Sequence, residues 1–213
     1  MTRSSEPKNP DWYNNFYASG GWNYDPIQQS TWLNDRLFLN IDIEPGSRIL
    51  EIGCGEGAQA EAMRLLGYDV TAVDFSDVGI AHAKERYPKV EFIAMDAADM
   101  DFPDGSFDMV FIRGMSWYHY ELDERCRERT AKFMQFIKPG GYFALLIKTD
   151  FSGEWDESGV LLNKFDAYVD LFSPFGDIVL CTDWLGKPLR NAGDAVGSKN
   201  IIIVTRVGAC GLL

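Results

Sequence analysis

The 213-residue chain is poor in cysteine, and no two of its four cysteines form a CxxC pair: they are Cys54, Cys126, Cys181 and Cys210. Such scattered positions argue against a zinc site and a disulfide framework, and they are typical of a reducing compartment. No apolar run approaches the roughly 18 residues of a membrane span, and no apolar region follows the first residues as it would in a secretory signal. We therefore expect a cytoplasmic protein without a metal site and without a membrane partner.

Basic residues are also scarce, because 20 lysines and arginines stand against 32 aspartates and glutamates, which gives a formal net charge of −12. A surface that binds DNA or RNA has to neutralise phosphates and is usually basic, and this chain has no basic run. The charge balance therefore argues against a nucleic-acid partner. With a hydrophobic share of 46%, the chain is long enough for one domain with a substantial core, and we expect a monomer or a homodimer.

The most informative segment is the glycine-rich stretch from Ile49 to Gly57. A short apolar strand contains an acidic residue, Glu51, and then turns through three glycines that are spaced two apart: Gly53, Gly55 and Gly57. Glycine allows the backbone to turn sharply and to approach a ligand closely. The following residues, 58–66, read as a helix, and the junction of such a strand and helix is a cofactor site in open α/β sheets.

Glu51 bears on which cofactor this turn would hold. A dinucleotide places its pyrophosphate over the glycine turn, at the positive end of the following helix, and a carboxylate two residues before the first glycine would repel it. The same carboxylate suits a ligand that carries an ammonium group and no phosphate, such as S-adenosylmethionine. The spacing Gly53-x-Gly55-x-x-Ala58 nevertheless also fits the dinucleotide fingerprint, so the turn alone leaves both cofactor classes open.

Two further predicted strands also stop at acidic residues. The run Val70–Val73 ends at Asp74, which is placed to accept both ribose hydroxyls of either cofactor class, and Phe75 would offer a face to the adenine. Ser76 is a suitable cap for a helix over 77–86. The second run, 90–94, stops at Asp96.

These segments, with the Phe102–Ile112 stretch and the Pro139-Gly140-Gly141 entry to a later strand, resemble in order and spacing the class I S-adenosylmethionine-dependent methyltransferases over residues 46–148. The resemblance implies an α/β fold, a Rossmann-like three-layer sandwich around a mostly parallel seven-stranded sheet of order 3-2-1-4-5-7-6 with strand 7 antiparallel. It further implies that Asp96 and Ala97 contact the adenine. The expected cofactor-binding residues are Glu51, Gly53, Cys54, Gly55, Gly57, Asp74, Phe75, Asp96, Ala97 and Arg113.

The chain divides into an N-terminal helical and aromatic cap extension, 1–45, and the methyltransferase domain, 46–213, which together form one structural domain. In the extension, Asp25 and Pro26 predict a helix start, and that helix is expected to run to about Asn40. Apolar residues at helical spacing predict a helix over 161–172. Runs rich in Ile and Val predict the last two strands at 177–181 and 201–205.

Three segments are expected to surround the methyl acceptor. They are the aromatic-rich extension with its Gly20-Gly21 hinge, the segment 113–120 that follows the fourth strand, and the loop 149–157. His119 is the candidate general base, because a histidine can take a proton near neutral pH; a packing role weighs equally. His82, in a predicted surface helix, is expected to be structural. The predicted substrate-binding residues are Tyr17, Trp22, Trp117, Tyr118 and Trp155.

We therefore expect an enzyme that transfers the methyl group of S-adenosylmethionine to a small molecule by in-line displacement, with an oxygen acceptor slightly preferred to nitrogen. S-adenosylhomocysteine would be the product. The alternatives are a nicotinamide-dependent dehydrogenase and a non-catalytic protein that keeps the cofactor-binding fold. Binding measurements with NAD and S-adenosylmethionine distinguish a dehydrogenase from a methyltransferase. A turnover assay distinguishes an enzyme from a non-catalytic protein.

Overall fold

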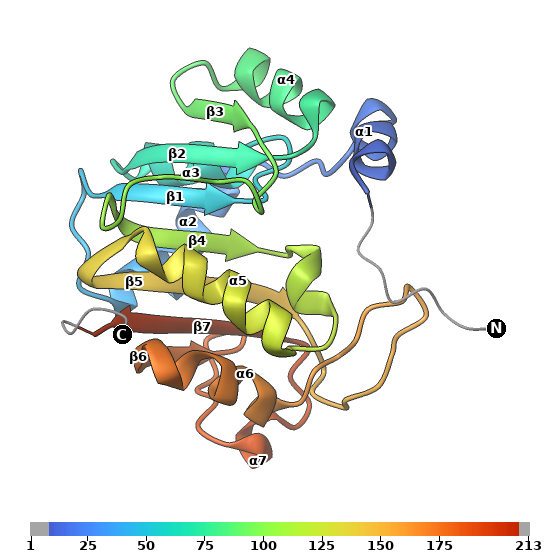
Figure 1. Ribbon diagram of the computed structural model, residues 1–213, viewed down its shortest axis with the longest axis vertical. Helices are drawn as coiled ribbons and strands as arrows, with labels where there is room; N and C mark the ends of the chain where they lie inside the picture. Colours follow the sequence, from blue (N-terminus) through green and yellow to red (C-terminus); the bar gives the residue numbers. More distant parts are fainter. Residues whose placement is uncertain (1–8, 209–213) are drawn as a thin grey trace.

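The computed structural model describes residues 9–208 and contains a seven-stranded sheet between two layers of helices (Figure 1). The strand order is β3-β2-β1-β4-β5-β7-β6. Strand β7 runs antiparallel to both β5 and β6, and the other neighbouring strands are parallel, so the expected sheet is confirmed. The strands are β1 (Arg48–Ile52), β2 (Asp69–Asp74), β3 (Glu91–Ala94), β4 (Phe107–Arg113), β5 (Ile137–Lys148), β6 (Gly176–Thr182) and β7 (Asn200–Val207).

The helices divide between the two faces of the sheet. One face carries α2 (Pro26–Arg36), α3 (Ala58–Leu65) and α4 (Asp77–Arg86), and the other carries α5 (Glu124–Gln135), α6 (Phe165–Phe172) and α7 (Ala192–Ala195). Strand β4 illustrates the alternation, since Met109 and Phe111 pack on the α2–α3 face while Val110 and Ile112 pack on the α5–α6 face. A strand buried on both faces reads as a continuous apolar run, which is typical of a parallel sheet covered by helices.

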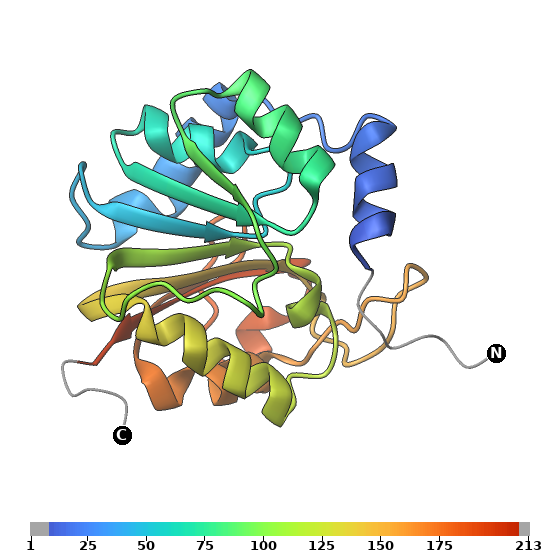
Figure 2. The ribbon, with the colours of Figure 1, turned by 45° about the horizontal axis from the view of Figure 1, so that its top comes forward.

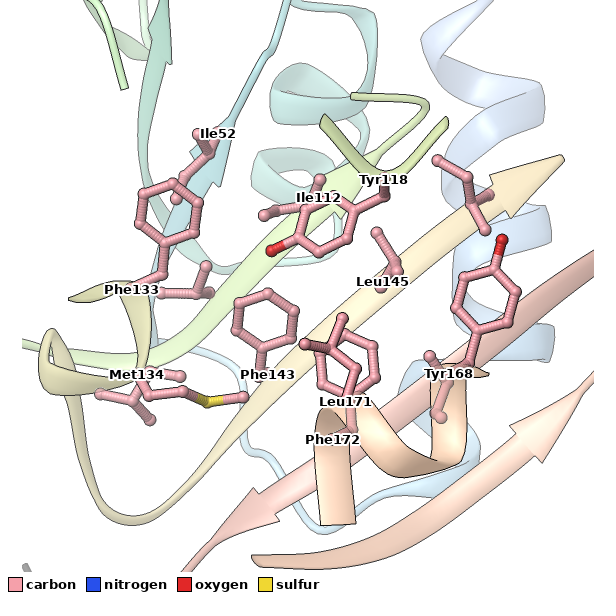
Figure 3. Close-up of a cluster of buried hydrophobic side chains, with 14 of the residues drawn as sticks. Ile52, Ile112, Tyr118, Phe133, Met134, Phe143, Leu145, Tyr168, Leu171 and Phe172 are labelled. Carbon is pink, nitrogen blue, oxygen red and sulfur yellow. The ribbon is translucent and has the colours of Figure 1, made fainter. Parts of the chain in front are cut away.

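The core under α5 and α6 is rich in aromatic side chains (Figure 3). Phe143 and Phe172 pack 5.3 Å apart, and the ring of Tyr118 lies 6.4 Å from that of Phe172. Tyr118 is only 1% exposed, and its hydroxyl shares a hydrogen bond of 3.1 Å with Thr130 on α5. Tyr118 therefore belongs to the core below the sheet's carboxyl edge rather than to a surface at that edge.

Two expected helices differ in their bounds. The helix that starts at the Asp25 cap ends at Arg36, and a short 3-10 helix, η1 (Phe38–Asn40), follows it. The Asn40 side chain donates to the carbonyl of Asp35, which competes with continued helical bonding. The helix predicted over 161–172 begins only at Phe165, because the preceding backbone is bonded to the β5–α6 loop: Gly153 N donates to Leu162 O at 2.8 Å.

Helix α1 (Pro10–Ala18) lies beyond the carboxyl ends of β1 and β2, beside the start of α4 (Figure 2). Asn14 holds it there, since its side-chain oxygen accepts from the Ser76 hydroxyl at 2.6 Å. Ser76 is the predicted N-cap of α4, and its own hydroxyl accepts from the amide of Gly79. Within residues 9–208, no helix has the length and apolar character needed to cross a bilayer.

Candidate functional site

The glycine turn joins β1 to α3 at the carboxyl edge of the sheet. Gly55 and Gly57 both adopt positive φ, +54° and +80°, which a side chain would strain. A Cβ at Gly57 would stand 2.5 Å from the ring of Phe92, and Gly57 caps α3 without a side-chain hydrogen bond. The first amides of α3 therefore face the turn without a side-chain acceptor from the cap, as expected where a ligand approaches a helix N-terminus.

Asp74, at the end of β2, holds this turn in place. One of its carboxylate oxygens accepts from the amide of Gly55 at 2.8 Å, and the other accepts from the amide of Ser76 at 2.9 Å. Burial raises the pKa of the Asp74 carboxyl, and these amide bonds work against that rise. The amide of Phe75 also bonds to this carboxylate, and since an ionised carboxylate has about four acceptor positions, capacity is left for a ribose hydroxyl.

Glu51 is 1% exposed and lies on the α2–α3 face of β1. Burial raises the pKa of its carboxyl to about 8; attraction to Arg113 lowers it, and repulsion from Asp74 raises it further. Its Oε2 atom is buried and has no hydrogen-bond partner among the described residues. Buried acceptors are rarely left unbonded, so this oxygen fits an additional donor such as a ligand ammonium group. The acidic turn suits S-adenosylmethionine better than a pyrophosphate.

Two tyrosines of α1 cover the turn. Tyr17 is buried against Gly55 and Gly79, and burial raises the pKa of its phenol, with a further rise from Asp74. Tyr13 lies 5.2 Å from the ring of Phe75, and burial raises its phenol pKa while a hydrogen bond with the Ser116 side chain lowers it. The sequence predicted Tyr17 as a substrate-binding residue, and the structure places it against the glycine turn. Tyr13 was not among the predicted site residues, although its i, i+4 spacing from Tyr17 puts both rings on one face of α1.

The candidate acceptor side is built around η2 (Ser116–His119), the 3-10 helix after β4. The carbonyl of His119 accepts from Leu161 N at 2.8 Å, and the carbonyl of Tyr120 accepts from Asn163 Nδ2 at 2.9 Å. The ring of Trp155 lies 6.0 Å from that of Tyr120. These contacts bring η2 and the β5–α6 loop together, as expected for two of the segments around the acceptor.

Two further predicted substrate-binding residues, Trp117 on η2 and Trp22 after α1, pack against neighbouring side chains. Trp117 stacks on Phe133 of α5 at 5.8 Å, and the Arg129 guanidinium lies 3.9 Å from its ring centre, so it packs on the α5 face with Tyr118. Trp22 is 57% exposed, and its ring lies 5.2 Å from that of Phe16.

On the cofactor side, Ala97 is buried, whereas the exposed Asp96 accepts from the amide of Ala98 at 2.8 Å. Cys54 is buried in the turn, and burial raises the pKa of its thiol. The structural role expected for His82 agrees with its contact to the buried Glu56, at 2.9 Å. Among the residues that the structure describes, no group of three or more acidic, histidine or cysteine side chains could hold a metal ion.

Comparison with known proteins agrees with this geometry. A family described as "Methyltransferase domain" matches residues 49–141. The chain is 32% identical over 149 residues to demethylmenaquinone methyltransferase of Renibacterium salmoninarum, covering 66% of this chain and 60% of that protein. It is 38% identical over 91 residues to EEF1A lysine methyltransferase 4 of Mus musculus, covering 39% of this chain and 36% of that protein. The chain thus spans less than two thirds of each of these two relatives.

Among solved structures, the chain resembles the [4+2]-cyclase SpnF with a TM-score of 0.69 at 17% identity, covering 94% of this chain and 96% of that one. At this identity the likeness shows the fold alone. The fold and the acidic glycine turn define a Rossmann-like α/β domain. Over residues 49–141 the chain is similar to the methyltransferase-domain family, and this likeness, the strand order and the acidic glycine turn are those of the class I S-adenosylmethionine-dependent methyltransferases, whose cofactor is S-adenosylmethionine.

Proposed function

We propose that the protein transfers the methyl group of S-adenosylmethionine to a small-molecule acceptor, with a hydroxyl oxygen preferred to an amine. The observation that carries this proposal is the grouping of α1, η2 and the β5–α6 loop beyond the carboxyl ends of the strands. Tyr13 bonds to Ser116, and Tyr120 packs near Trp155, so these contacts place aromatic and hydroxyl groups from the three segments beside the glycine turn. Ligand sites of small molecules are lined mainly by aromatic and apolar groups with a few polar ones, which is the composition found here.

The cofactor is assigned to the residues around the turn. Glu51 would receive the ammonium group, Asp74 the ribose hydroxyls, and the stretch from Asp96 to Ala97 the adenine. S-adenosylmethionine supplies a methyl group that its sulfonium already activates for displacement. The protein therefore has mainly to align the acceptor and to exclude water, and alignment supplies much of the rate in such reactions. The aromatic residues of the 1–45 extension would cover the site.

His119 is assigned as the group that accepts the acceptor's proton. It lies on η2, next to Tyr120 and bonded through its backbone to Leu161. Proton removal helps a hydroxyl acceptor most, which is the reason for preferring oxygen. The cysteines and the remaining histidine are given no chemical role.

A protein lysine is the second candidate acceptor. The relative from Mus musculus is named for a protein lysine, and the β5–α6 loop is acidic, with Asp150, Glu154 and Glu157 near Trp155. An acidic rim would attract a cationic side chain. The likeness to the [4+2]-cyclase SpnF makes a direct turnover measurement necessary, because fold does not fix function.

Titration calorimetry and a turnover assay test the proposal together. We expect S-adenosylmethionine and S-adenosylhomocysteine to bind and NAD not to bind. We further expect S-adenosylhomocysteine to be released when the enzyme is incubated with S-adenosylmethionine and a panel of small hydroxylated aromatics. Release with small amines alone would overturn the oxygen preference. If S-adenosylhomocysteine is released only with lysine-containing proteins, the acceptor is a protein lysine and not a small molecule. If S-adenosylmethionine binds but no S-adenosylhomocysteine is released with any acceptor, the protein has no catalytic role.

A further inference from the structure

Arg113, the last residue of β4, is enclosed by three aromatic rings. Its guanidinium carbon lies 5.2 Å from the ring centre of Tyr24, 5.1 Å from that of Trp32 and 5.1 Å from that of Trp184. Its Nη1 atom also donates to the side-chain oxygen of Gln29 at 2.6 Å. We call Tyr24, Trp32, Trp184 and Gln29 the arginine box.

The arginine box is built from segments far apart in the sequence. Tyr24 precedes α2, Gln29 and Trp32 lie on α2, and Trp184 lies in the loop after β6. The rings of Trp32 and Trp184 also contact each other, with centres 5.8 Å apart at an angle of 75°. An arginine held among ring faces is attracted to them electrostatically and keeps a defined orientation. The box therefore fixes the Arg113 guanidinium relative to both α2 and the β6–β7 connection.

Arg113 is also the neighbour of Glu51 across the sheet. Glu51 pairs with Phe111 in the β1–β4 register, and Arg113 follows Phe111 by two residues on the same face. Diagonal neighbours of this kind are within reach of long side chains. The electrostatics of the two groups agree with this proximity: burial raises the pKa of Glu51 and attraction to Arg113 opposes that rise, while burial lowers the pKa of Arg113 and attraction to Glu51 opposes that fall.

The remaining groups that face Glu51 do not replace this cation. Asp74 of β2 repels its negative charge, and Cys54, whose thiol pKa burial raises, supplies no positive charge. The backbone amide of Ala60 on α3 supports the ionised carboxylate by a hydrogen bond. Of the groups that act electrostatically on Glu51, Arg113 therefore supplies the positive charge.

We propose that Arg113 is a positioning residue for the cofactor: the arginine box holds its guanidinium near Glu51, so that the ionised carboxylate is favoured at the glycine turn when the cofactor ammonium binds. The proposal rests on the assignment of Glu51 to the cofactor ammonium made above. It goes beyond that assignment, because it takes Arg113 out of direct contact with the cofactor. It also makes the packing of α2 and of the Trp184 loop part of the cofactor site.

The consequence is that cofactor binding is linked to a proton. Glu51 has a pKa of about 8 in the free protein, so much of it is protonated at pH 7. Binding of an ammonium group favours the ionised carboxylate and releases that proton. Without Arg113 the free protein would hold the proton more firmly, so binding would release more protons at pH 8 and would be weaker at neutral pH.

The test is calorimetric titration of the full chain with S-adenosylhomocysteine, from pH 6 to 9, in paired buffers that differ in ionisation enthalpy. We expect the wild type to release protons near pH 7 and few at pH 9. Arg113→Met should weaken binding about tenfold at pH 7 and increase proton release at pH 8. Arg113→Lys should recover part of the affinity, and Trp184→Leu should shift the profile in the direction of Arg113→Met by a smaller amount.

Arg48→Met is the matched control, because Arg48 also lies over an aromatic ring, that of Phe107 at 5.0 Å, but at the start of β1. It should leave the binding profile unchanged. Thermal denaturation of each variant establishes that it is folded before binding is measured, and the lysine variant serves if the methionine variant is unfolded.

The outcomes separate this proposal from the site on which it rests. If Glu51→Gln binds with wild-type affinity and wild-type proton release, the assignment of Glu51 fails. If Glu51→Gln loses affinity and proton release, but Arg113→Met and Arg113→Lys both match the wild-type pH profile, only the role of Arg113 fails. In the Glu51→Gln background, adding Arg113→Met should cause little further loss of affinity; a full tenfold additional loss would show that Arg113 acts by another route.

Discussion

The phenol of Tyr17 lies directly against Gly55, so that a Cβ at position 55 would stand 2.5 Å from the Tyr17 hydroxyl oxygen. Tyr17 belongs to α1, and Gly55 is the central glycine of the turn, where the amide is held by Asp74 at 2.8 Å. The N-terminal helix and the turn are therefore complementary surfaces. A substitution in the turn should therefore change the position of α1, and a substitution in α1 should change cofactor binding at the turn. Both effects can be measured.

Replacing Gly55 by alanine should displace α1 as well as strain the turn. The left-handed backbone costs alanine about 1–2 kcal/mol, and the new methyl group meets the Tyr17 hydroxyl. We expect S-adenosylhomocysteine affinity to fall at least tenfold, on the order of 1.4 kcal/mol, by calorimetry. Gly140→Ala is the control, since Gly140 has φ +82° with open space around it, and it should lose stability without losing affinity. Equal affinity in both variants would contradict the contact.

Removing the Asn14 side chain should loosen α1 on the body of the domain. Asn14 accepts from the Ser76 hydroxyl at 2.6 Å, which ties α1 to the start of α4. We expect Asn14→Ala to increase hydrogen exchange in residues 10–18 and to weaken S-adenosylhomocysteine binding by about threefold to tenfold, because the variant loses the Ser76 hydrogen bond and the longer one from the Val78 amide. Asn15→Ala, on the exposed side of the same helix, is the control. Unchanged exchange in α1 would show that other contacts, such as Tyr17 with Gly79, are sufficient.

The sequence predicted the sheet and the turn more fully than the cap. The order of strands came from the family resemblance, and local signals such as the Ser76 cap of α4 were confirmed. The contact of Asn14 with Ser76 joins residues 62 positions apart, and no local pattern encodes such a pairing. The aromatic segment after β4 could not be assigned from the sequence either. A short 3-10 helix has too few turns for an amphipathic pattern to show which rings face the core, and in the structure the ring of Tyr118 is the one that is fully buried.

His119→Ala should lower the methyl-transfer rate while sparing cofactor affinity. A positioned general base contributes about 10²–10⁴-fold to rate, so we expect kcat to fall at least a hundredfold with a hydroxyl acceptor. The measurement is S-adenosylhomocysteine release at saturating S-adenosylmethionine, together with calorimetric affinity. His82→Ala removes the other histidine, whose ring contacts the Glu56 side chain at 2.9 Å and lies on α4 rather than on η2, and it should retain the rate. If His119→Ala transfers methyl groups at the wild-type rate, His119 is not the general base and has only a packing role.

Glu51→Gln should stabilise the free protein at alkaline pH although it weakens the cofactor site. Burial raises the pKa of the folded-state carboxyl from 4.5 to about 8. Below pH 4.5 the carboxyl is protonated whether or not the chain is folded. Between pH 4.5 and 8 the unfolded chain ionises while the folded protein still holds the proton, so the wild type loses stability as pH rises, and the loss is complete above pH 8. Glutamine carries no charge in either state and escapes this loss.

The difference in melting temperature between Glu51→Gln and wild type should therefore grow from pH 5 to pH 8, to on the order of 10 °C, and then stay constant. Glu44→Gln, an exposed acid, controls for the loss of one negative charge. With saturating S-adenosylhomocysteine the wild type should melt at a higher temperature than Glu51→Gln. The ligand ammonium stabilises the ionised wild-type carboxylate, and the variant offers no such partner. If the difference in melting temperature is the same at every pH, burial does not raise the pKa of Glu51. Ionisation of this carboxyl would then not be linked to cofactor binding.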